Sequence, residues 1–530
     1  MLFYFASILF FIWVIRSTLF WVALWQLKEY RLDRIIIHLR ETTQGRSLVY
    51  SKFLLLKLVI ILVWIILIFR SELILSFRLL SLGVLTYQAY LIIKEFLARS
   101  TQRPIFTLKA LFVIFIVLTI ISLLFFVPFM ERFIWMIFLG ELIPFLIAFF
   151  VLSLSFPTEI YRDWQIEKAR KKISEHKNLL VIGVTGSYGK SSTKDYVAQI
   201  LEKKFKVLKT RGTNNTPIGI AKTILSGLRK DTQIFVVEMG AYKKGEITEM
   251  CQIVKPKIGI ITAVSEQHLS LFGSLKNVAE AKNELIEALP GNGLALFNGN
   301  SETAKKLFDK SHKKKVLYQV GPAVKNVELS ITAGGIKVRP SFITFDVSVG
   351  DNKTNLSAPL IGAQNVENIL PGIYIAYYLK MNDKQIKNAV SSLSPLPKVM
   401  EYHRSEDRAT YIDDTFNANP QSVLAALNYM KIYKGKKILV LQPMIELGKN
   451  AKSEHYRISK EISNICDDLL LTNRNFYDSI KKGIKDGGGD CAVLSAGPQE
   501  LFEFIKSETE KGDIVVFEGK EAANVLGLLL

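Results

Sequence analysis

The sequence has little cysteine. Its 530 residues include only Cys251, Cys466 and Cys491, and none of them forms a C-x-x-C pair. This spacing argues against a disulfide framework or a cysteine zinc site, and it fits a reducing cytoplasmic compartment. Internal repeats and low-complexity tracts are also lacking, which excludes a repeat architecture. No cleaved signal peptide is expected, because the N-terminus has neither a basic start nor a small-residue cleavage site.

Acidic residues are in deficit. The chain has 68 Lys and Arg residues against 48 Asp and Glu residues, which gives a net charge of +20. Such a balance is typical of proteins that bind nucleic acid or anionic lipid headgroups. Many of the basic residues flank apolar runs, so membrane lipids are the expected partner and no nucleic acid is expected.

Apolar residues are concentrated in the first 156 positions. Apolar stretches recur at about 2–26, 53–69, 72–93, 108–129 and 132–154. Each approaches the ~20 residues that a helix needs to cross a bilayer. Residues 1–156 are therefore predicted to form a helical membrane domain of about five spans, the weakest being 72–93.

The loops between these stretches predict the orientation. The loops after the first, third and fifth stretches are rich in Lys and Arg, whereas the intervening turns are short. Under the positive-inside rule the N-terminus faces out, and everything beyond Phe156 lies in the cytoplasm. The chain is thus predicted to be a multi-pass protein of the plasma (inner) membrane.

Four ionisable residues interrupt the apolar stretches. Lys57 lies near the end of a predicted span and is expected to snorkel toward the interface. Glu141 is expected to pair with Arg16 or Arg78 inside the bundle, or to face a lipid headgroup.

The rest of the chain has the pattern of an α/β protein. Residues 157–178 are charged and are predicted to form a basic helical linker. From Leu179 onward strands and helices alternate, which is typical of a mostly parallel sheet wrapped by helices. Two domains are predicted: a central ATP-binding domain over 179–396 and a Rossmann-like C-terminal α/β domain over 397–530.

The central domain is organised around Leu179–Tyr196, which reads LLVIGVTGSYGKSSTKDY. An apolar strand, a glycine turn, a lysine, hydroxyl residues and a helix follow one another, as in a phosphate-binding loop. An ordinary glycine turn is the alternative. The loop predicts a P-loop-type ATPase domain that binds ATP and Mg²⁺, with Lys190 as a catalytic residue and Ser191 as a metal ligand. The predicted cofactor-binding residues here are Thr185, Gly186, Ser187, Gly189, Lys190, Ser191 and Ser192.

Polar residues follow the next two predicted strands. Glu238 ends one strand and His268 follows another, on the sheet edge where open α/β sheets bind ligands. A carboxylate at this edge can hold Mg²⁺. A polar loop between the helices, with Asn214, Asn215 and Thr216, is predicted to hold a phosphate or a substrate carboxylate.

These motifs resemble those of the Mur ligases, the ATP-dependent enzymes that add amino acids to the peptidoglycan stem. The resemblance rests on T-G-S-Y-G-K-S-S-T at the loop, H-x-x-x-F-G-S from His268 and A-x-A-K ending at Lys282. It implies that Glu238 and His268 bind metal, that His268 and Lys282 serve catalysis and that Lys282 is carbamoylated. It also implies that Asn365 contacts the nucleotide base and that Asp413 belongs to the cofactor site.

One further stretch indicates a branch of that family. D-D-T-F-N-A-N-P, which starts at Asp413, is similar to the members that add D-alanyl-D-alanine. The resemblance implies substrate contacts from Asn417, Asn419 and Glu446. The chain departs from the family pattern at Gln364, Val399, Gln442, Pro443 and Glu518. The first 156 residues do not share the resemblance, because soluble members have a UDP-binding domain there.

The sequence therefore predicts a membrane-anchored, ATP-dependent amide ligase. It would add D-alanyl-D-alanine to a muramyl tripeptide through an acyl phosphate, and the muramyl peptide is either UDP-linked or lipid-linked. Two alternatives stay open: a related ligase with another substrate, such as a polyglutamate-type synthetase, and a non-catalytic nucleotide-binding scaffold tethered to the membrane.

Overall fold

The computed structural model divides the chain into two compact units, Met1–Arg162 and Asp163–Leu530, which are described in turn. The residues that it describes are 1–28, 30–41, 43–66, 74–97, 103–128, 131–212, 214–265, 272–322, 327–350, 352–403, 409–444, 447 and 450–530.

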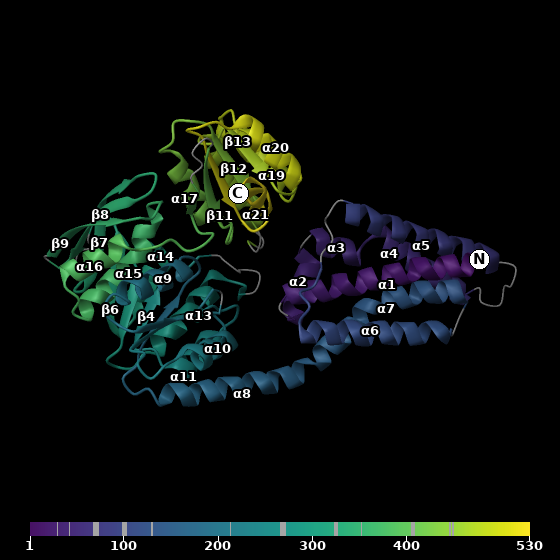
Figure 1. Cartoon of the computed structure of the whole chain (residues 1–530), viewed down its shortest axis with the longest axis horizontal. Helices are drawn as coiled ribbons and strands as arrows, with labels where there is room; N and C mark the ends of the chain where they lie inside the picture. The colour runs from purple at the N-terminus through teal and green to yellow at the C-terminus, as the bar shows by residue number, and fades with distance from the viewer. Residues whose placement is uncertain are drawn as a thin grey trace. The chain divides into compact units, whose positions relative to one another are not determined.

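The first unit is helical throughout its described part (Figure 1). Its helices are α1 (Leu2–Leu27), α2 (Leu32–Glu41), α3 (Thr43–Val49), α4 (Lys52–Ile66), α5 (Ile74–Leu97), α6 (Leu108–Phe126), α7 (Arg132–Ser153) and the start of α8 (Ser155–Ser174). α1 packs against α5, α6 and α7. Five helical segments are long and apolar enough to cross a membrane, in agreement with the number predicted: Leu2–Leu27, Gly45–Ile66, Ile74–Leu97, Leu108–Phe126 and Arg132–Ser174.

The four ionisable residues named above are paired, but not as the sequence predicted. Glu141 forms an ion pair with Lys57, and neither Arg16 nor Arg78 is its partner. The Lys57 ammonium is buried and also lies 4.9 Å from the ring centroid of Trp13, so it does not snorkel. The prediction failed because side chains from α4 and α7 meet only after packing, which spacing along the chain does not reveal.

The two arginines have carboxylate partners of their own. Arg16 pairs with Glu95 at 2.6 Å, and Arg78 pairs with Glu131 at 3.0 Å. Glu131 also caps α7, because its side chain accepts from the backbone N–H of Phe133.

The second unit begins with the C-terminal half of α8, whose residues Ile166, Ala169 and Ile173 pack into its core. The Lys172 ammonium donates to the carbonyl of Ile224, 3.0 Å away, in the last turn of a helix, where the negative end of the helix dipole favours a cation. The charged segment predicted to be helical is thus a helix fixed to this unit.

The first sheet of this unit has nine strands in the order β2-β3-β1-β4-β5-β6-β7-β8-β9. Pairing is parallel from β2 to β7 and antiparallel among β7, β8 and β9. The strands are β1 (Leu180–Thr185), β2 (Val207–Lys209), β3 (Ile234–Glu238), β4 (Ile258–Ile261), β5 (Leu294–Asn298), β6 (Lys314–Val320), β7 (Ser330–Val338), β8 (Ile343–Val349) and β9 (Asn352–Ala358).

Helices cover both faces of this sheet (Figure 1). Alternate residues of β1 point to opposite faces, so Ile182 and Val184 enter one core and Val181 enters the other. The helices are α9 (Lys190–Leu201), α10 (Pro217–Gly227), α11 (Glu246–Val254), α13 (Leu275–Glu287), α14 (Glu302–Lys310), α15 (Gln364–Tyr378) and α16 (Asp383–Ser391).

The second sheet has six strands in the order β10-β11-β15-β12-β13-β14. Only the pairing of β10 with β11 is antiparallel. The strands are β10 (Glu401–His403), β11 (Thr410–Asp414), β12 (Lys437–Leu441), β13 (Asp468–Leu471), β14 (Ala492–Ser495) and β15 (Ile514–Glu518). The helices are α17 (Pro420–Met430), α18 (Ala451–Ser463), α19 (Tyr477–Gly487), α20 (Pro498–Glu508) and α21 (Ala522–Leu529).

Candidate functional site

The site is built around the turn between β1 and α9. Gly186 has a φ of +153°, and a Cβ there would collide with the Thr262 hydroxyl, so only glycine fits. Gly189 has a φ of +76° and precedes the first turn of α9. The predicted loop residues therefore form a tight turn that leads directly into a helix N-terminus, an arrangement that favours anion binding.

Hydrogen bonds to the end of β4 hold this loop in place. The Ser187 N–H donates to the Ala263 carbonyl at 2.6 Å, and the Ser187 hydroxyl accepts from the Ser265 N–H at 3.0 Å. The Thr262 hydroxyl donates to the Tyr188 carbonyl at 2.6 Å. The loop is thus preorganised by the neighbouring strand.

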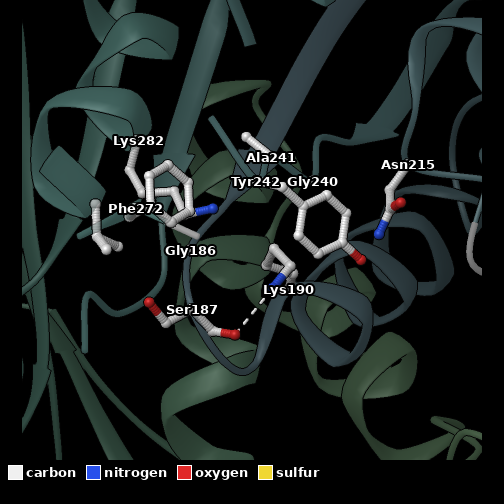
Figure 2. Close-up of a pocket in the computed structure, with 10 residues that line it drawn as sticks. Gly186, Ser187, Lys190, Asn215, Gly240, Ala241, Tyr242, Phe272 and Lys282 are labelled. Carbon is white, nitrogen blue, oxygen red and sulfur yellow. Dashed lines mark hydrogen bonds between the residues drawn. The ribbon is translucent and has the colours of Figure 1, made fainter. Parts of the chain in front are cut away.

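Lys190 lies at the mouth of the loop. Its ammonium donates to the Ser187 carbonyl at 2.9 Å, the contact drawn as a dashed line in Figure 2. Burial lowers the pKa of Lys190, and the negative charge of Glu238 opposes that decrease. The ammonium is therefore held inside the loop, where it can oppose charge on a phosphate.

Glu238 ends β3 and is 2% exposed. Its Oε1 atom accepts from the Asn215 amide at 3.0 Å, and its Oε2 atom lies 3.5 Å from the Lys194 ammonium. Oε2 is buried and has no hydrogen-bond partner among the described residues. A buried carboxylate oxygen with a free lone pair suits a hard cation such as Mg²⁺.

Lys282 reaches the same space from α13 and is 3% exposed. Burial and the nearby Lys190 charge lower the pKa of Lys282 to about 7, while Glu246 and Glu284 oppose the decrease. Its ammonium lies 5.9 Å from the Phe272 ring centroid. A substantial fraction of this amine is therefore neutral near pH 7 and available as a nucleophile.

These side chains surround a small cavity of about 40 Å³. Figure 2 shows the amines of Lys190 and Lys282 turned toward the same space, with the Tyr242 ring beside them. The lining residues are Gly186, Ser187, Lys190, Asn215, Gly240, Ala241, Tyr242, Phe272, Val278 and Lys282. Residues predicted from three separate motifs thus converge on one cavity.

Other predicted residues of this region have structural contacts. Thr216 is the N-cap of α10, because its hydroxyl accepts from the Gly219 N–H at 3.3 Å. Asn214 precedes this cap, and its N–H donates to the Arg211 carbonyl. Ser191 and Ser192 lie in the first turn of α9. His268 lies outside the described residues.

Asn365 is internal to the fold. Its Oδ1 atom accepts from the Tyr196 hydroxyl at 3.1 Å, and its amide donates to the Ile361 carbonyl at 2.8 Å. Asn368, one turn further along α15, lies against the loop instead: its Oδ1 atom accepts from the Thr193 hydroxyl at 3.4 Å. A Cβ on Gly189 would lie 2.7 Å from the same atom.

Three predicted residues follow or end β11. The buried carboxylate of Asp413 accepts from the N–H of Thr415 at 3.0 Å. Asn417 is exposed. Asn419 caps α17, with its side-chain oxygen accepting from the N–H groups of Gln421 and Ser422. Glu446 lies outside the described residues.

Sequence reasoning missed Lys194 and Tyr242. Lys194 is fully buried, pairs with Glu238 and lies one helical turn after Lys190. That spacing is a signal that it shares a helix face with Lys190. Tyr242 follows β3 by four residues and offered no such signal.

Comparison with known proteins gives matches along most of the α/β part. The model of the Mur ligase middle domain matches residues 184–376, and that of the Mur ligase glutamate ligase domain matches residues 400–521. A UDP-N-acetylmuramoyl-tripeptide–D-alanyl-D-alanine ligase of Synechocystis is 32% identical over 359 residues, covering 66% of this chain and 72% of the relative. This chain belongs to the Mur ligase family.

Solved structures of Mur ligases share the fold of the α/β part. A crystal structure of MurF from Acinetobacter baumannii matches with a TM-score of 0.61 at 23% identity, covering 69% of this chain and 79% of that one. A MurF ligase from Thermotoga maritima, solved in complex with ADP, has a TM-score of 0.60 at 21% identity, covering 69% and 83%. The family resemblance seen in the sequence is thereby confirmed, and as a Mur ligase the chain is an ATP-dependent ligase.

Proposed function

We propose that this chain ligates D-alanyl-D-alanine to a muramyl tripeptide with hydrolysis of ATP to ADP and phosphate. The observation that carries the proposal is that Lys190 and Lys282 line one cavity beside the glycine loop, and that Glu238 bonds to Asn215, another lining residue. The relative from Synechocystis, whose name states this activity, supports the substrate.

The reaction has two steps. A carboxylate oxygen of the tripeptide attacks the γ-phosphorus of ATP, which forms an acyl phosphate and releases ADP. The amine of the dipeptide then attacks the acyl carbon and loses a proton, and phosphate leaves as the amide forms. Both steps shift negative charge between oxygens, so positioning and charge neutralisation are the main contributions of the protein.

We assign the phosphate contacts to the loop after β1, as a P-loop-type site. The N–H groups of Tyr188–Ser191 would surround the β-phosphate, and the Lys190 ammonium would leave the Ser187 carbonyl for a phosphate oxygen. Ser191, Glu238 and His268 would hold Mg²⁺, which supplies positive charge to the transferring phosphoryl group. The free lone pair of buried Glu238 supports this role.

Lys282 has a second proposed role. As a neutral amine it would attack CO₂ and lose a proton, giving a carbamate with one negative charge. Its lowered pKa of about 7 favours this reaction near neutral pH, because only the neutral amine is nucleophilic. The carbamate would reach toward the metal site and offset the charge of Lys190.

The nucleotide base is proposed to lie near the N-terminal turn of α15. Asn365 is the residue implied by the family resemblance, but its oxygen and amide are already bonded inside the fold. A base contact would require Asn365 to exchange one of these hydrogen bonds, whereas Asn368 lies next to Gly189 and therefore at the phosphate end of the site. The exposed Asn417 remains a proposed contact for the incoming dipeptide, whereas a nucleotide contact of Asp413 rests on the family resemblance alone.

The helical unit is proposed to anchor the enzyme as a multi-pass protein of the plasma membrane, with the α/β part, including a Rossmann-like C-terminal domain, in the cytoplasm. Its five apolar segments and the basic residues that follow the first, third and fifth support this orientation. Because these helices replace the UDP-binding domain of soluble relatives, a lipid-linked tripeptide is a second candidate substrate.

The test uses purified full-length protein in detergent with ATP, Mg²⁺, D-alanyl-D-alanine and a panel of UDP-linked muramyl tripeptides. Mass spectrometry should detect a pentapeptide product that requires both ATP and the dipeptide. ATP hydrolysis without any amide product in the whole panel would contradict the proposed activity.

A further inference from the structure

The hairpin of β10 and β11 holds a group of possible metal ligands outside the cavity described above. Glu401 and His403 lie two residues apart on β10, and Asp413 is the partner of Glu401 on the antiparallel strand β11. Side chains two apart on a strand, and side chains paired across two strands, point to the same face of a sheet. The hairpin therefore gathers all three side chains on one face.

The ligand atoms of these side chains are close together. One ring nitrogen of His403 and one carboxylate oxygen each of Glu401 and Asp413 all lie within 4.8 Å of one another. A zinc ion bonds nitrogen and oxygen at about 2.0–2.2 Å, so ligand atoms around it stand roughly 3–4 Å apart. The observed limit of 4.8 Å exceeds this spacing by roughly 1–2 Å, so an ion would draw the three side chains closer together.

Hydrogen bonds already orient both carboxylates. Asp413 Oδ1 accepts from the N–H and the hydroxyl of Thr415, and Glu401 Oε2 accepts from the Lys398 N–H at 2.9 Å. In the described part of the chain, no donor bonds to the other oxygen of either carboxylate. Metal-binding carboxylates are held in this way by outer hydrogen bonds that leave one oxygen for the ion.

The two carboxylates carry negative charge that no described residue neutralises, and one ring nitrogen of the histidine has no hydrogen-bond partner among those residues. Neither Glu401 nor Asp413 forms an ion pair with a described residue, although Asp413 is buried. His403 Nε2 is shielded from solvent and has no hydrogen-bond partner among the same residues. Two neighbouring carboxylates and an unsatisfied imidazole nitrogen are unfavourable together, and a bound cation relieves both costs.

We propose that Glu401, His403 and Asp413 bind a divalent transition-metal cation, with zinc as the best fit. Imidazole nitrogen together with carboxylate oxygen suits zinc, whereas Mg²⁺ prefers oxygen ligands alone. The ion would tie the edge strand β10 to β11 and stabilise the start of the second sheet. In this role Asp413 would bind the ion and not the nucleotide, which was its role by the family resemblance. The proposal does not depend on the ligase reaction.

Cobalt binding to the metal-free, full-length protein in detergent tests the proposal, because Co²⁺ replaces zinc and absorbs visible light when bound to imidazole and carboxylate. The wild-type protein should show a saturable absorption band that zinc abolishes. His403→Gln should weaken binding at this site by at least about tenfold, and Glu401→Gln should also weaken it.

Two histidine variants serve as controls. His312→Gln changes an exposed histidine away from the hairpin and should bind Co²⁺ as the wild type does. His268→Gln removes the ligand predicted for the catalytic site. Any Co²⁺ absorption band in this variant therefore comes from the hairpin site. Zinc should raise the melting temperature of the wild type and of both controls, but not that of His403→Gln.

The proposal is wrong if the wild type binds no Co²⁺ beyond what His403→Gln binds, or if zinc stabilises both proteins equally. A His403→Gln protein that melts at the wild-type temperature without metal excludes misfolding as the cause of lost binding.

Discussion

Two buried carboxyl groups should make the second sheet less stable as the pH rises. Asp414 and Glu518 are paired residues on β11 and β15, with exposures of 5% and 0%. Burial raises the pKa of Asp414 from 3.8 to about 7 and raises that of Glu518 well above its ordinary value. The pair can therefore exist only with a shared proton at moderate pH.

The sign and size of the effect follow from linkage. Between pH 3.8 and 7 the unfolded chain has released the Asp414 proton while the folded chain keeps it, so stability falls as the pH rises through this window. At about 1.4 kcal/mol for each pH unit, the Asp414 proton alone accounts for a loss of about 4 kcal/mol by pH 7, and the raised pKa of Glu518 adds to the loss in the same direction. Asp414→Asn combined with Glu518→Gln replaces the shared proton with permanent amide donors and should abolish this loss.

Hydrogen exchange read by mass spectrometry, corrected for intrinsic rates, measures the effect locally. Peptides that cover β11 and β15 should lose protection between pH 5 and pH 7 in the wild type but not in the double variant. Glu503→Gln, an exposed residue of α20, is the matched control and should behave as the wild type does. An equal loss of protection in the wild type and the double variant would refute the reasoning.

Further predictions concern the active site and the membrane. Lys190→Ala should abolish turnover while the protein stays folded by circular dichroism, and near-normal ligation would reject its role. Lys282→Ala should be inactive but partly restored by a short carboxylic acid in a ligation assay, whereas Lys282→Arg should not be rescued, because Arg forms no carbamate. A reporter active only in the cytoplasm should score positive after Phe156 or Lys94 and negative at Ser71; a signal at Ser71 would overturn the orientation.

Local patterns predicted much of the fold. Residues 438–441 and 469–471 are continuous apolar runs, a pattern that predicts buried strands, and the structure has β12 and β13 there. β2 and β10 have no such pattern, since each has only three residues and none of them is fully buried. Such strands are stabilised by pairing with a neighbouring strand, and their own residue types do not predict that pairing.

In the candidate site, too, some features are predictable from the sequence and others are not. The phosphate loop was predictable because its glycines, lysine and helix start are adjacent in sequence. The pairing of Lys194 with Glu238, and the contact of Asn368 with the loop, depend on tertiary packing. The capping role of Asn419 is predictable from the sequence, since Asn followed by Pro is typical of a helix start.

The structure also changes the argument for a lipid-linked substrate. Charges inside apolar helices are costly unless they are paired or used, and Arg16 and Glu141 both have partners within the bundle. They give no support to a lipid-binding role, so the remaining support is that apolar helices precede residue 184, where the match to the Mur ligase middle domain begins. Competition between UDP-linked and lipid-linked tripeptide at equal concentration in nanodiscs decides the question. Preference for the lipid-linked form is expected if the helices hold the substrate. Preference for the UDP-linked form, with full activity in a variant that starts near Thr158, would leave the helices with anchoring alone.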